Sequence, residues 1–381
     1  MLESQFWFPI WVIFLLERDI SLSQIVIADM IFRAAIVILE FPLGMMGDKI
    51  GRRKTYFWGA ACAAITYFIL IHTHNFAMLI LCWILWGFFW SLISGTNTAY
   101  RYELLITGPS CSKDVQIFGY FNSIAAAALV LSHTTAGYLY SFMPSLPIWI
   151  NVVFSIVAAL LILTLPEVNR KVNEKAHLSW TEMQQVFQTL FRQNSLILPI
   201  IFIFALWNAY HWTPTLIFQP LLEDLGLPKS SFGLVFAAFT GMGIISGLIT
   251  GRLAEIFGNF TMIIVGVLLQ VTAVSLTAFG HNIFIIISGI VILRFAYNLC
   301  EPILSVLLNR EIGDNIRASI ISLVNLIASL IMIISRPLIG LVADNYSIQT
   351  GFMLWFFIGL VFFCISLIFL VRIKPKIDKI R

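Results

Sequence analysis

Charged side chains stand inside long apolar stretches of this chain, at spacings that bring them together. Asp29, Arg33 and Glu40 lie in one such stretch, and at about 100° per residue in a helix they fall within an arc of about 40°. Arg33 and Asp29, four residues apart, can form an ion pair within the helix, whereas Glu40 has no partner there. Such groups can bind a polar solute or carry a proton, or they can simply neutralise each other.

A second stretch repeats the pattern with Arg294, Asn298 and Glu301 on one face, directly before Pro302. Proline removes one backbone hydrogen bond and favours a kink or an interrupted helix, either for packing or for binding. A polar group in an apolar segment needs a partner in protein or water. We therefore expect these residues to line a shared interior with further polar and aromatic residues of other stretches: Trp90, Asn97, Asn208, His211, Gln219 and Asn325.

The elements that position these residues are membrane-spanning helices. The chain is 60% hydrophobic and 11% charged, with a mean hydropathy of +0.93, which excludes an ordinary soluble domain. Its 381 residues can supply about twelve spans of about 20 residues, so we predict an all-α polytopic membrane protein. The apolar runs lie near residues 4–16, 23–46, 55–73, 76–100, 116–140, 146–165, 196–222, 231–250, 260–280, 282–308, 318–343 and 350–371.

The first run is unusually short, because it reaches Glu17, Arg18 and Asp19 soon after Met1. It has too few residues to cross about 30 Å of hydrocarbon comfortably. Either the helix is short and the bilayer thins locally, or the start codon has been assigned too far downstream, which we favour. A cleavable signal peptide is not expected, since a basic region and a small-residue cleavage site are absent.

Lysine and arginine residues predict the orientation of the chain, because cytoplasmic loops carry the excess of positive charge. With both termini in the cytoplasm, the outer loops hold only Arg18 and Lys229 of these residues. We therefore expect a multi-pass protein of the plasma membrane, or of the inner membrane in a Gram-negative bacterium. The inner side then holds Lys49, Arg52, Arg53, Lys54, Arg101, Lys113, Arg170, Lys171, Lys175, Arg192, Arg252, Arg310, Arg317 and the basic tail.

The chain also shows signs of internal repetition. The third, sixth, ninth and twelfth runs have no charged residue in their interiors, which indicates three-helix units with one member facing lipid. One long polar segment divides the runs into two sets of six. We predict an amino-terminal bundle at 1–166, a cytoplasmic linker at 167–195 and a carboxyl-terminal bundle with a short basic tail at 196–381.

Two short loops repeat each other between apolar runs. Residues 47–54 read Gly-Asp-Lys-Ile-Gly-Arg-Arg-Lys, and residues 251–259 form a degenerate copy in which Glu255 aligns with Asp48 and Gly258 with Gly51. The first loop closely resembles the signature loop of the major facilitator superfamily, and the likeness extends along the whole chain. This resemblance implies about twelve helices in two pseudo-symmetric six-helix halves, and transport by alternating access.

The resemblance also implies roles for the loop residues. In family members the carboxylate and arginine of this loop form a charge network that closes the cytoplasmic side, and Asp48, Gly51, Arg52, Glu103 and Glu255 match those positions. A turn that only sets the topology is the alternative. Asn259 stands where the second loop would carry its arginine, so we expect a weaker network there. The Gly-Pro-Gly-Gly pattern of drug antiporters is missing from the fifth run.

We therefore predict a secondary transporter, and not an enzyme, for a small organic solute that is amphiphilic or zwitterionic. Asp29, Arg33 and Glu40 are expected to face the Arg294 set across a central cavity. Protons are the expected coupling ion, with Glu40 and Glu301 titrating, and efflux of a drug or metabolite is one direction. We expect a monomer in the bilayer with no cofactor, metal or nucleic-acid partner. A transport-incompetent sensor or scaffold is the alternative.

Overall fold

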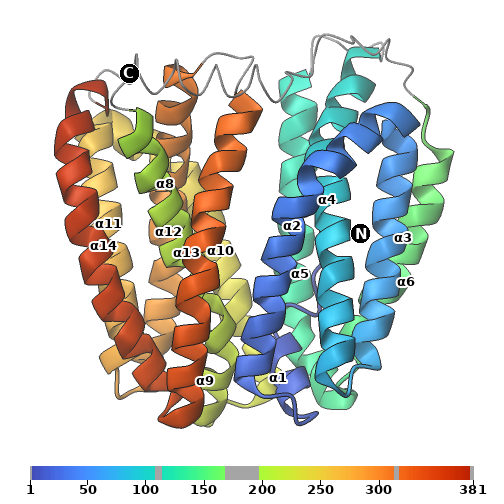
Figure 1. Cartoon of the computed structure of the whole chain (residues 1–381), viewed down its shortest axis with the longest axis horizontal. Helices are drawn as coiled ribbons and strands as arrows, with labels where there is room; N and C mark the ends of the chain where they lie inside the picture. The colour runs from blue at the N-terminus through green and yellow to red at the C-terminus, as the bar shows by residue number, and fades with distance from the viewer. Residues whose placement is uncertain (1, 108–113, 168–196, 313–316, 378–381) are drawn as a thin grey trace. The chain divides into compact units, whose positions relative to one another are not determined.

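The structure, a computed structural model, describes residues 2–107, 114–167, 197–312 and 317–377. All regular elements in these residues are helices. Figure 1 shows them as bundles of long, roughly aligned helices. In chain order they are α1 (Trp11–Leu16), α2 (Leu22–Ile50), α3 (Arg52–Ile71), α4 (Phe76–Thr107), α5 (Asp114–Phe142), α6 (Leu146–Thr164), α8 (Ile197–Trp212), the 3-10 helix η3 (Thr213–Ile217), α9 (Phe218–Asp224), α10 (Lys229–Phe257), α11 (Asn259–Phe279), α12 (Ile283–Glu311), α13 (Arg317–Asn345) and α14 (Ile348–Ile377).

Contacts divide the chain into two compact units. Unit 1 comprises Met1–Val172 and Gly226–Ala237, and unit 2 comprises Asn173–Leu225 and Ala238–Arg381. The first turns of α10 therefore belong to unit 1 and the rest to unit 2. In unit 1, α3 packs against α4 and α6, and α5 packs against α6. In unit 2, α11 packs against α12 and α14, and α13 packs against α14, so the two units repeat the same helix pairings.

Ten helical stretches of the described residues, counting α8 to α9 as one, are long and apolar enough to cross a membrane. The six residues of α1 are too few, and the described part of α5 is not in this set. Large apolar side chains are exposed along α6 and α14, including Val153, Leu160, Val361 and Ile368. A protein in water would rarely expose such rows, whereas a lipid surface requires them.

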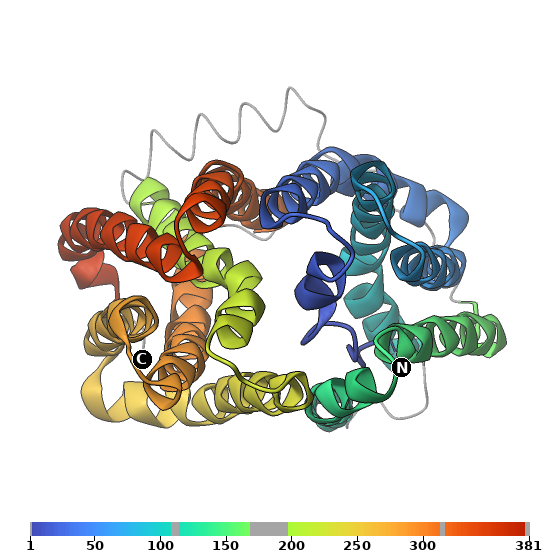
Figure 2. The same cartoon turned by 90° about the horizontal axis from the view of Figure 1, so that it is seen from below.

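The first apolar run does not form a continuous helix, and the expected helix over residues 4–16 is wrong in this respect. Only α1 is helical, and turns precede it. Backbone polar groups in an apolar setting must still be satisfied, and Asn151 of α6 accepts from Trp7 N at 3.2 Å and donates to Ser4 O at 2.6 Å. Ser132 Oγ of α5 accepts from Gln5 N at 3.0 Å. These bonds hold the N-terminal segment against the other helices of unit 1 (Figure 2).

The seventh apolar run is also not one helix, since α8, η3 and α9 replace the single helix that the sequence predicts. Pro214 has no N–H for the carbonyl of Tyr210, and Trp355 Nε1 of α14 donates to that carbonyl at 3.3 Å. The carbonyl of Trp212, at the end of α8, accepts from Arg336 Nη2 of α13 at 2.5 Å. Side chains thus replace the backbone hydrogen bonds lost at the break, which makes it tolerable away from water.

α5 and the first turns of α10 approach each other closely at two glycines. A Cβ at Gly137 would lie 2.5 Å from the carbonyl oxygen of Lys229 and 2.6 Å from that of Ser230. A Cβ at Gly233 would lie 2.4 Å from the carbonyl oxygen of His133. Small residues allow helices in membranes to pack at such short range, so these two positions set the contact between α5 and α10.

Candidate functional site

Asp29 and Arg33 form an ion pair on α2. Arg33 Nε donates to Asp29 Oδ2 at 3.3 Å. The Asp29 side chain is buried and that of Arg33 is half-buried. The carboxylate therefore offsets the guanidinium charge within an apolar helix, which is the pairing that their spacing allows. The side chain of Glu40, farther along α2, lies outside the described part of the structure.

Arg294 of α12 and His211 of α8 form the polar centre of unit 2. Arg294 Nη1 lies 3.2 Å from His211 Nε2. A guanidinium has only donors, so Nε2 must be the acceptor and the imidazole proton must sit on Nδ1. Both His211 Nδ1 and Arg294 Nε are buried and lack a hydrogen-bond partner among the described residues. The centre thus carries a positive charge in an apolar setting, and its Arg294 Nε lacks an acceptor among the described residues.

Aromatic rings enclose this pair. The guanidinium carbon of Arg294 lies 5.3 Å from the ring centroids of Trp212 and Phe239 and 5.6 Å from that of Tyr297. The His211 ring stacks on Tyr297 at 4.1 Å and on Phe239 at 5.8 Å. Such rings stabilise a desolvated cation by about 0.5–2 kcal/mol. Within the described residues no carboxylate forms an ion pair with Arg294.

Hydrogen bonds of Asn208 and Asn298 connect α8 and α10 to this centre. Tyr297 OH donates to Asn208 Oδ1 of α8 at 2.7 Å, so the tyrosine that stacks on the histidine is itself anchored. Asn298 Nδ2 donates to the carbonyl of Gly243 in α10 at 3.0 Å. A Cβ at Gly243 would lie 2.8 Å from Arg294 Nε, so glycine leaves room for the guanidinium. Tyr297 was not among the predicted cavity residues, although it shares their face of the helix.

Pro302 lies inside α12, which continues through it as one helix, eight residues after Arg294. It leaves the carbonyl of Asn298 without its usual N–H donor, and Thr250 Oγ1 of α10 lies 3.4 Å from that oxygen. At Pro214 a side chain likewise replaces the missing donor, since Trp355 Nε1 donates to the carbonyl of Tyr210. Helices broken or weakened near their polar residues are typical of binding sites in transporters.

The other predicted cavity residues of unit 2 lie in varied settings. Glu301 is half-buried on α12, Gln219 is buried in α9, and Asn325 is exposed on α13. The structure thus joins His211, Arg294 and the residues bonded to them, whereas Asn325 is an exposed residue of another helix. That these residues face Asp29, Arg33 and Glu40 across a cavity stays a prediction.

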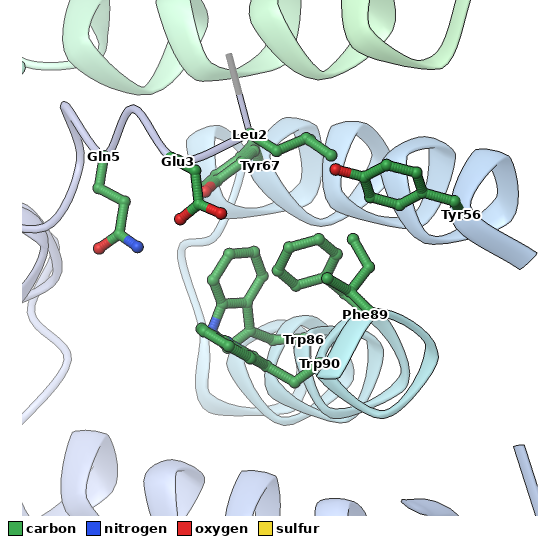
Figure 3. Close-up of a pocket in the computed structure, with 9 residues that line it drawn as sticks. Leu2, Glu3, Gln5, Tyr56, Tyr67, Trp86, Phe89 and Trp90 are labelled. Atoms are coloured by element: carbon green, nitrogen blue, oxygen red, sulfur yellow. The ribbon is translucent and has the colours of Figure 1, made fainter. Parts of the chain in front are cut away.

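Unit 1 contains a small cavity of about 130 Å³ between the N-terminal segment, α3 and α4. Figure 3 shows the Glu3 carboxylate and the Gln5 amide extending towards the indole rings of Trp86 and Trp90. Trp86 is buried, whereas Trp90 is 38% exposed. Of the predicted residues this cavity includes Trp90, while the side chain of Asn97 on the same helix lies outside the described part. Sequence reasoning missed Glu3, because it precedes the helical part of its run.

The two repeated loops have the same backbone turn. Gly51 begins α3 with φ 94° and ψ 144°, and Gly258 begins α11 with φ 81° and ψ 146°. A residue with a Cβ rarely adopts such positive φ angles, which explains glycine at both positions. The turn returns the chain directly into the next helix, as the aligned sequences predict.

Charges beside the first loop are paired in a way that the sequence did not indicate. Arg53 Nη2 lies 3.3 Å from Glu167 Oε2, and its Nη1 donates to Leu165 O at 3.0 Å. These contacts connect the start of α3 to the end of α6. Short-range sequence patterns could not predict them, because Arg53 and Glu167 are 114 residues apart. Arg52 is half-buried and Glu255 is exposed. The side chains of the predicted gate residues Asp48 and Glu103 lie outside the described part of the structure.

Three polar residues meet at the opposite end of unit 1. Glu17, which follows α1, accepts hydrogen bonds from Tyr140 OH of α5 and from Lys229 Nζ at the start of α10. Partial burial raises the pKa of Glu17, but the hydrogen bonds from Lys229 and Tyr140 and the lysine charge outweigh it and lower that pKa overall. The ionised carboxylate therefore holds α10 close to α5.

A sequence model of the Major Facilitator Superfamily matches residues 1–221 and 209–381, which together cover the whole chain. The chain belongs to this superfamily. Its all-α fold is therefore that of a multi-pass membrane transporter, as the loop resemblance predicts, and its family is one of transporters and not of enzymes.

Relatives and solved structures agree with this membership. The chain is 24% identical over 97% of its length to an uncharacterized MFS-type transporter, YxaM, of Bacillus subtilis, covering 92% of that protein. It is 22% identical over 87% of its length to the class B tetracycline resistance protein of Escherichia coli, covering 82% of it. A structure of the nucleoside transporter NupG superposes with a TM-score of 0.73 at 17% identity, covering 98% of this chain and 96% of that one. This last likeness shows the fold.

Proposed function

We propose that the chain is a secondary active transporter that moves a small organic solute by alternating access and couples this movement to protons. The Arg294 centre carries the proposal. It places a guanidinium inside an apolar helix, held by His211 and aromatic rings, without an ion-paired carboxylate in the described part of the chain. Charges in such positions mark substrate or ion paths in membrane proteins.

The chemistry of this centre favours an amphiphilic or zwitterionic solute. Arg294 and Asn298 offer polar groups, and Trp212, Phe239 and Tyr297 offer apolar faces. Among the similar proteins, one is named for tetracycline resistance and another for nucleoside transport, and both names refer to small organic molecules. The first name supports export of a drug or metabolite as the direction of movement.

Glu301 and Glu40 are the proposed proton carriers. Glu301 is half-buried on the same helix as Arg294, two turns farther along, where its charge and that of the guanidinium act on each other. A carboxylate in this setting can bind a proton in one state of the transport cycle and release it in another. Glu40 is proposed for the same role from its place on α2.

Proteoliposomes loaded with a pH-sensitive dye test the proposal. Tetracycline, uridine and choline are added in turn under an imposed pH gradient, and a solute that is carried should change the internal pH. Glu301→Gln and Glu40→Gln should abolish this proton movement, whereas Glu223→Gln on α9 should retain it. Solute movement that still follows the gradient in both variants would remove these carboxylates from coupling. The alternative is a sensor or scaffold. In that case the protein moves none of these solutes, and adding them does not change the accessibility of its cysteines from either face of the membrane.

The loop residues are proposed to close the cytoplasmic side. Asp48, Arg52 and Glu103 form the proposed charge network, and Glu255 marks the weaker copy in the second loop. We further propose that the transporter acts as a monomer with both termini in the cytoplasm. Its proposed domains are two six-helix bundles, at 1–166 and 196–381, joined by a linker at 167–195.

A further inference from the structure

Arg294 of unit 2 carries a charge that no neighbouring side chain neutralises. In unit 1 the guanidinium of Arg33 has the Asp29 carboxylate at 3.3 Å, whereas within the described residues no carboxylate forms an ion pair with Arg294. Glu301 lies seven residues farther along the same helix, which is about 10 Å along the helix axis. A charge inside a membrane is costly, and its presence there points to a function.

The guanidinium also has N–H groups without acceptors. Arg294 Nη1 lies 3.2 Å from His211 Nε2, and Nε is buried without a hydrogen-bond partner among the described residues. Nη2 has no acceptor in this part of the chain either, and unlike Nε it is not enclosed, so an incoming group can reach it. Because a guanidinium has only donors, the missing partner is an acceptor.

Two accessible aromatic rings lie beside the guanidinium. Trp212 and Tyr297 are half-buried, as Arg294 is. Their ring centroids lie 5.3 and 5.6 Å from the guanidinium carbon. The two rings are 6.1 Å apart and are inclined at 69° to each other. Together with Arg294 they offer one positive charge and two apolar ring surfaces.

These features favour an anion with an apolar body. The guanidinium would repel a cation, and a neutral solute would leave the positive charge without a counter-ion. A carboxylate fits best, because its two oxygens accept strong, charge-assisted hydrogen bonds from a guanidinium. An aromatic ring attached to the carboxylate can pack edge-to-face or offset-stacked against other aromatic rings, here those of Trp212 and Tyr297.

We propose that Arg294, Trp212 and Tyr297 bind an aromatic organic acid as the transported solute, with its carboxylate on the guanidinium. The inference deepens the proposed transport function and rests on it. His211 and Gly243 are positioning residues. His211 accepts the hydrogen bond from Nη1, and the absence of a side chain at Gly243 leaves room for the guanidinium.

Equilibrium dialysis of tritiated 2-naphthoate against the purified full chain in detergent, with empty micelles as background, tests the inference. The ligand is ionised at pH 7.5, since carboxyl groups have pKa values near about 4. Neutral 2-naphthamide and cationic 2-naphthylmethylamine should each compete at least tenfold more weakly than unlabelled 2-naphthoate. Inorganic phosphate, an anion without an apolar body, should also compete at least tenfold more weakly.

Variants of two site residues extend the test. Arg294→Gln should weaken 2-naphthoate binding at least tenfold, and Arg294→Lys should recover part of the loss because it keeps the charge. Trp212→Leu should weaken binding at least threefold, and Trp212→Phe should recover much of this loss because it restores an aromatic face.

Matched controls separate recognition from folding. Arg372→Gln removes the charge of an exposed arginine of α14, and Trp58→Leu changes a 59% exposed tryptophan of α3. Both should bind 2-naphthoate within twofold of the unaltered protein. Thermal unfolding verifies that each variant is folded, and the comparison of ligands on the unaltered protein decides the question if Arg294→Gln is not.

Three outcomes would each overturn the inference: equal competition by 2-naphthamide or by phosphate, unchanged binding by folded Arg294→Gln, or no binding of 2-naphthoate at millimolar concentration. The result is independent of the transport assay. Proton movement driven by tetracycline, uridine or choline, with no 2-naphthoate binding, would overturn the carboxylate site and leave transport standing. Binding of 2-naphthoate that depends on Arg294, with no solute-driven proton movement, would support the site and contradict the transport function.

Discussion

Adding one methyl group at Gly137 should separate α5 from α10 and destabilise the protein. The Cβ of Gly137→Ala would lie 2.5 and 2.6 Å from two carbonyl oxygens at the start of α10. An ordinary contact of this kind needs about 3.4 Å, so the two helix backbones must move apart by nearly 1 Å. The obstacle is backbone, and therefore no side-chain rotation can relieve it.

The size of the effect follows from two opposing terms. Alanine favours a helix over glycine by about 1 kcal/mol, and overpacking a close contact costs about 1–3 kcal/mol. Gly247→Ala is the matched control, because Gly247 is an exposed residue of α10 and its Cβ would meet nothing within 4 Å. The helix-propensity term cancels between the variants, so Gly137→Ala should be less stable than Gly247→Ala by about 1–3 kcal/mol.

Thermal unfolding of the purified proteins, followed by tryptophan fluorescence at one scan rate, measures this difference. At about 2–4 °C per kcal/mol for a unit of this size, the midpoints should differ by about 2–12 °C. Gly233→Ala should resemble Gly137→Ala, since its Cβ would lie 2.4 Å from a carbonyl oxygen of α5. If Gly137→Ala and Gly247→Ala are equally stable, the close crossing of α5 and α10 is wrong.

Other predictions concern single contacts and are also checked by thermal unfolding. The lowered pKa of Glu17 means that its stabilisation is present above the unfolded-state pKa, near 4.3, and is lost as the pH falls through the folded-state value. Lys229→Met should therefore flatten the stability profile below about pH 4.5 and cost about 0.2–1 kcal/mol at pH 7, and an unchanged profile would contradict the ion pair. Tyr297→Phe removes a hydrogen bond of 2.7 Å to Asn208 and should cost about 1–2 kcal/mol, so an unchanged midpoint would contradict a stabilising role for this bond. Gly51→Ala should cost about 1–3 kcal/mol, because φ is 94° and strains a residue with a Cβ; a stabilised variant would refute the turn.

Much of the fold could be predicted from local sequence. Long apolar runs predict helices wherever the backbone must satisfy its own hydrogen bonds, and most observed helices begin and end near the predicted residues. The aligned glycines at 51 and 258 predict a repeated turn, which the matching backbone angles confirm. Spacing by four likewise predicted the contact between Asp29 and Arg33.

The candidate site was less predictable, because its partners lie far apart in the sequence. Helical spacing identified His211 and Arg294 as interior residues, but it could not show that one accepts a hydrogen bond from the other across 83 positions. The aromatic and acidic walls of the unit 1 cavity also come from separate segments. Glu3 lies there because the first run does not continue as a helix, which apolar composition alone did not reveal.

The sequence by itself determined the membrane setting, most of the helical elements and the repeated loops, since each depends on composition or on residues within a turn or two. Tertiary structure alone decided how the break at Pro214 is tolerated and which groups meet. Because Pro214 has no N–H, the carbonyl of Tyr210 loses its backbone donor. The side chain of Trp355, 145 residues away, supplies the replacement hydrogen bond. A buried polar group must find a partner wherever the fold brings one, and chain distance places no limit on where that partner lies.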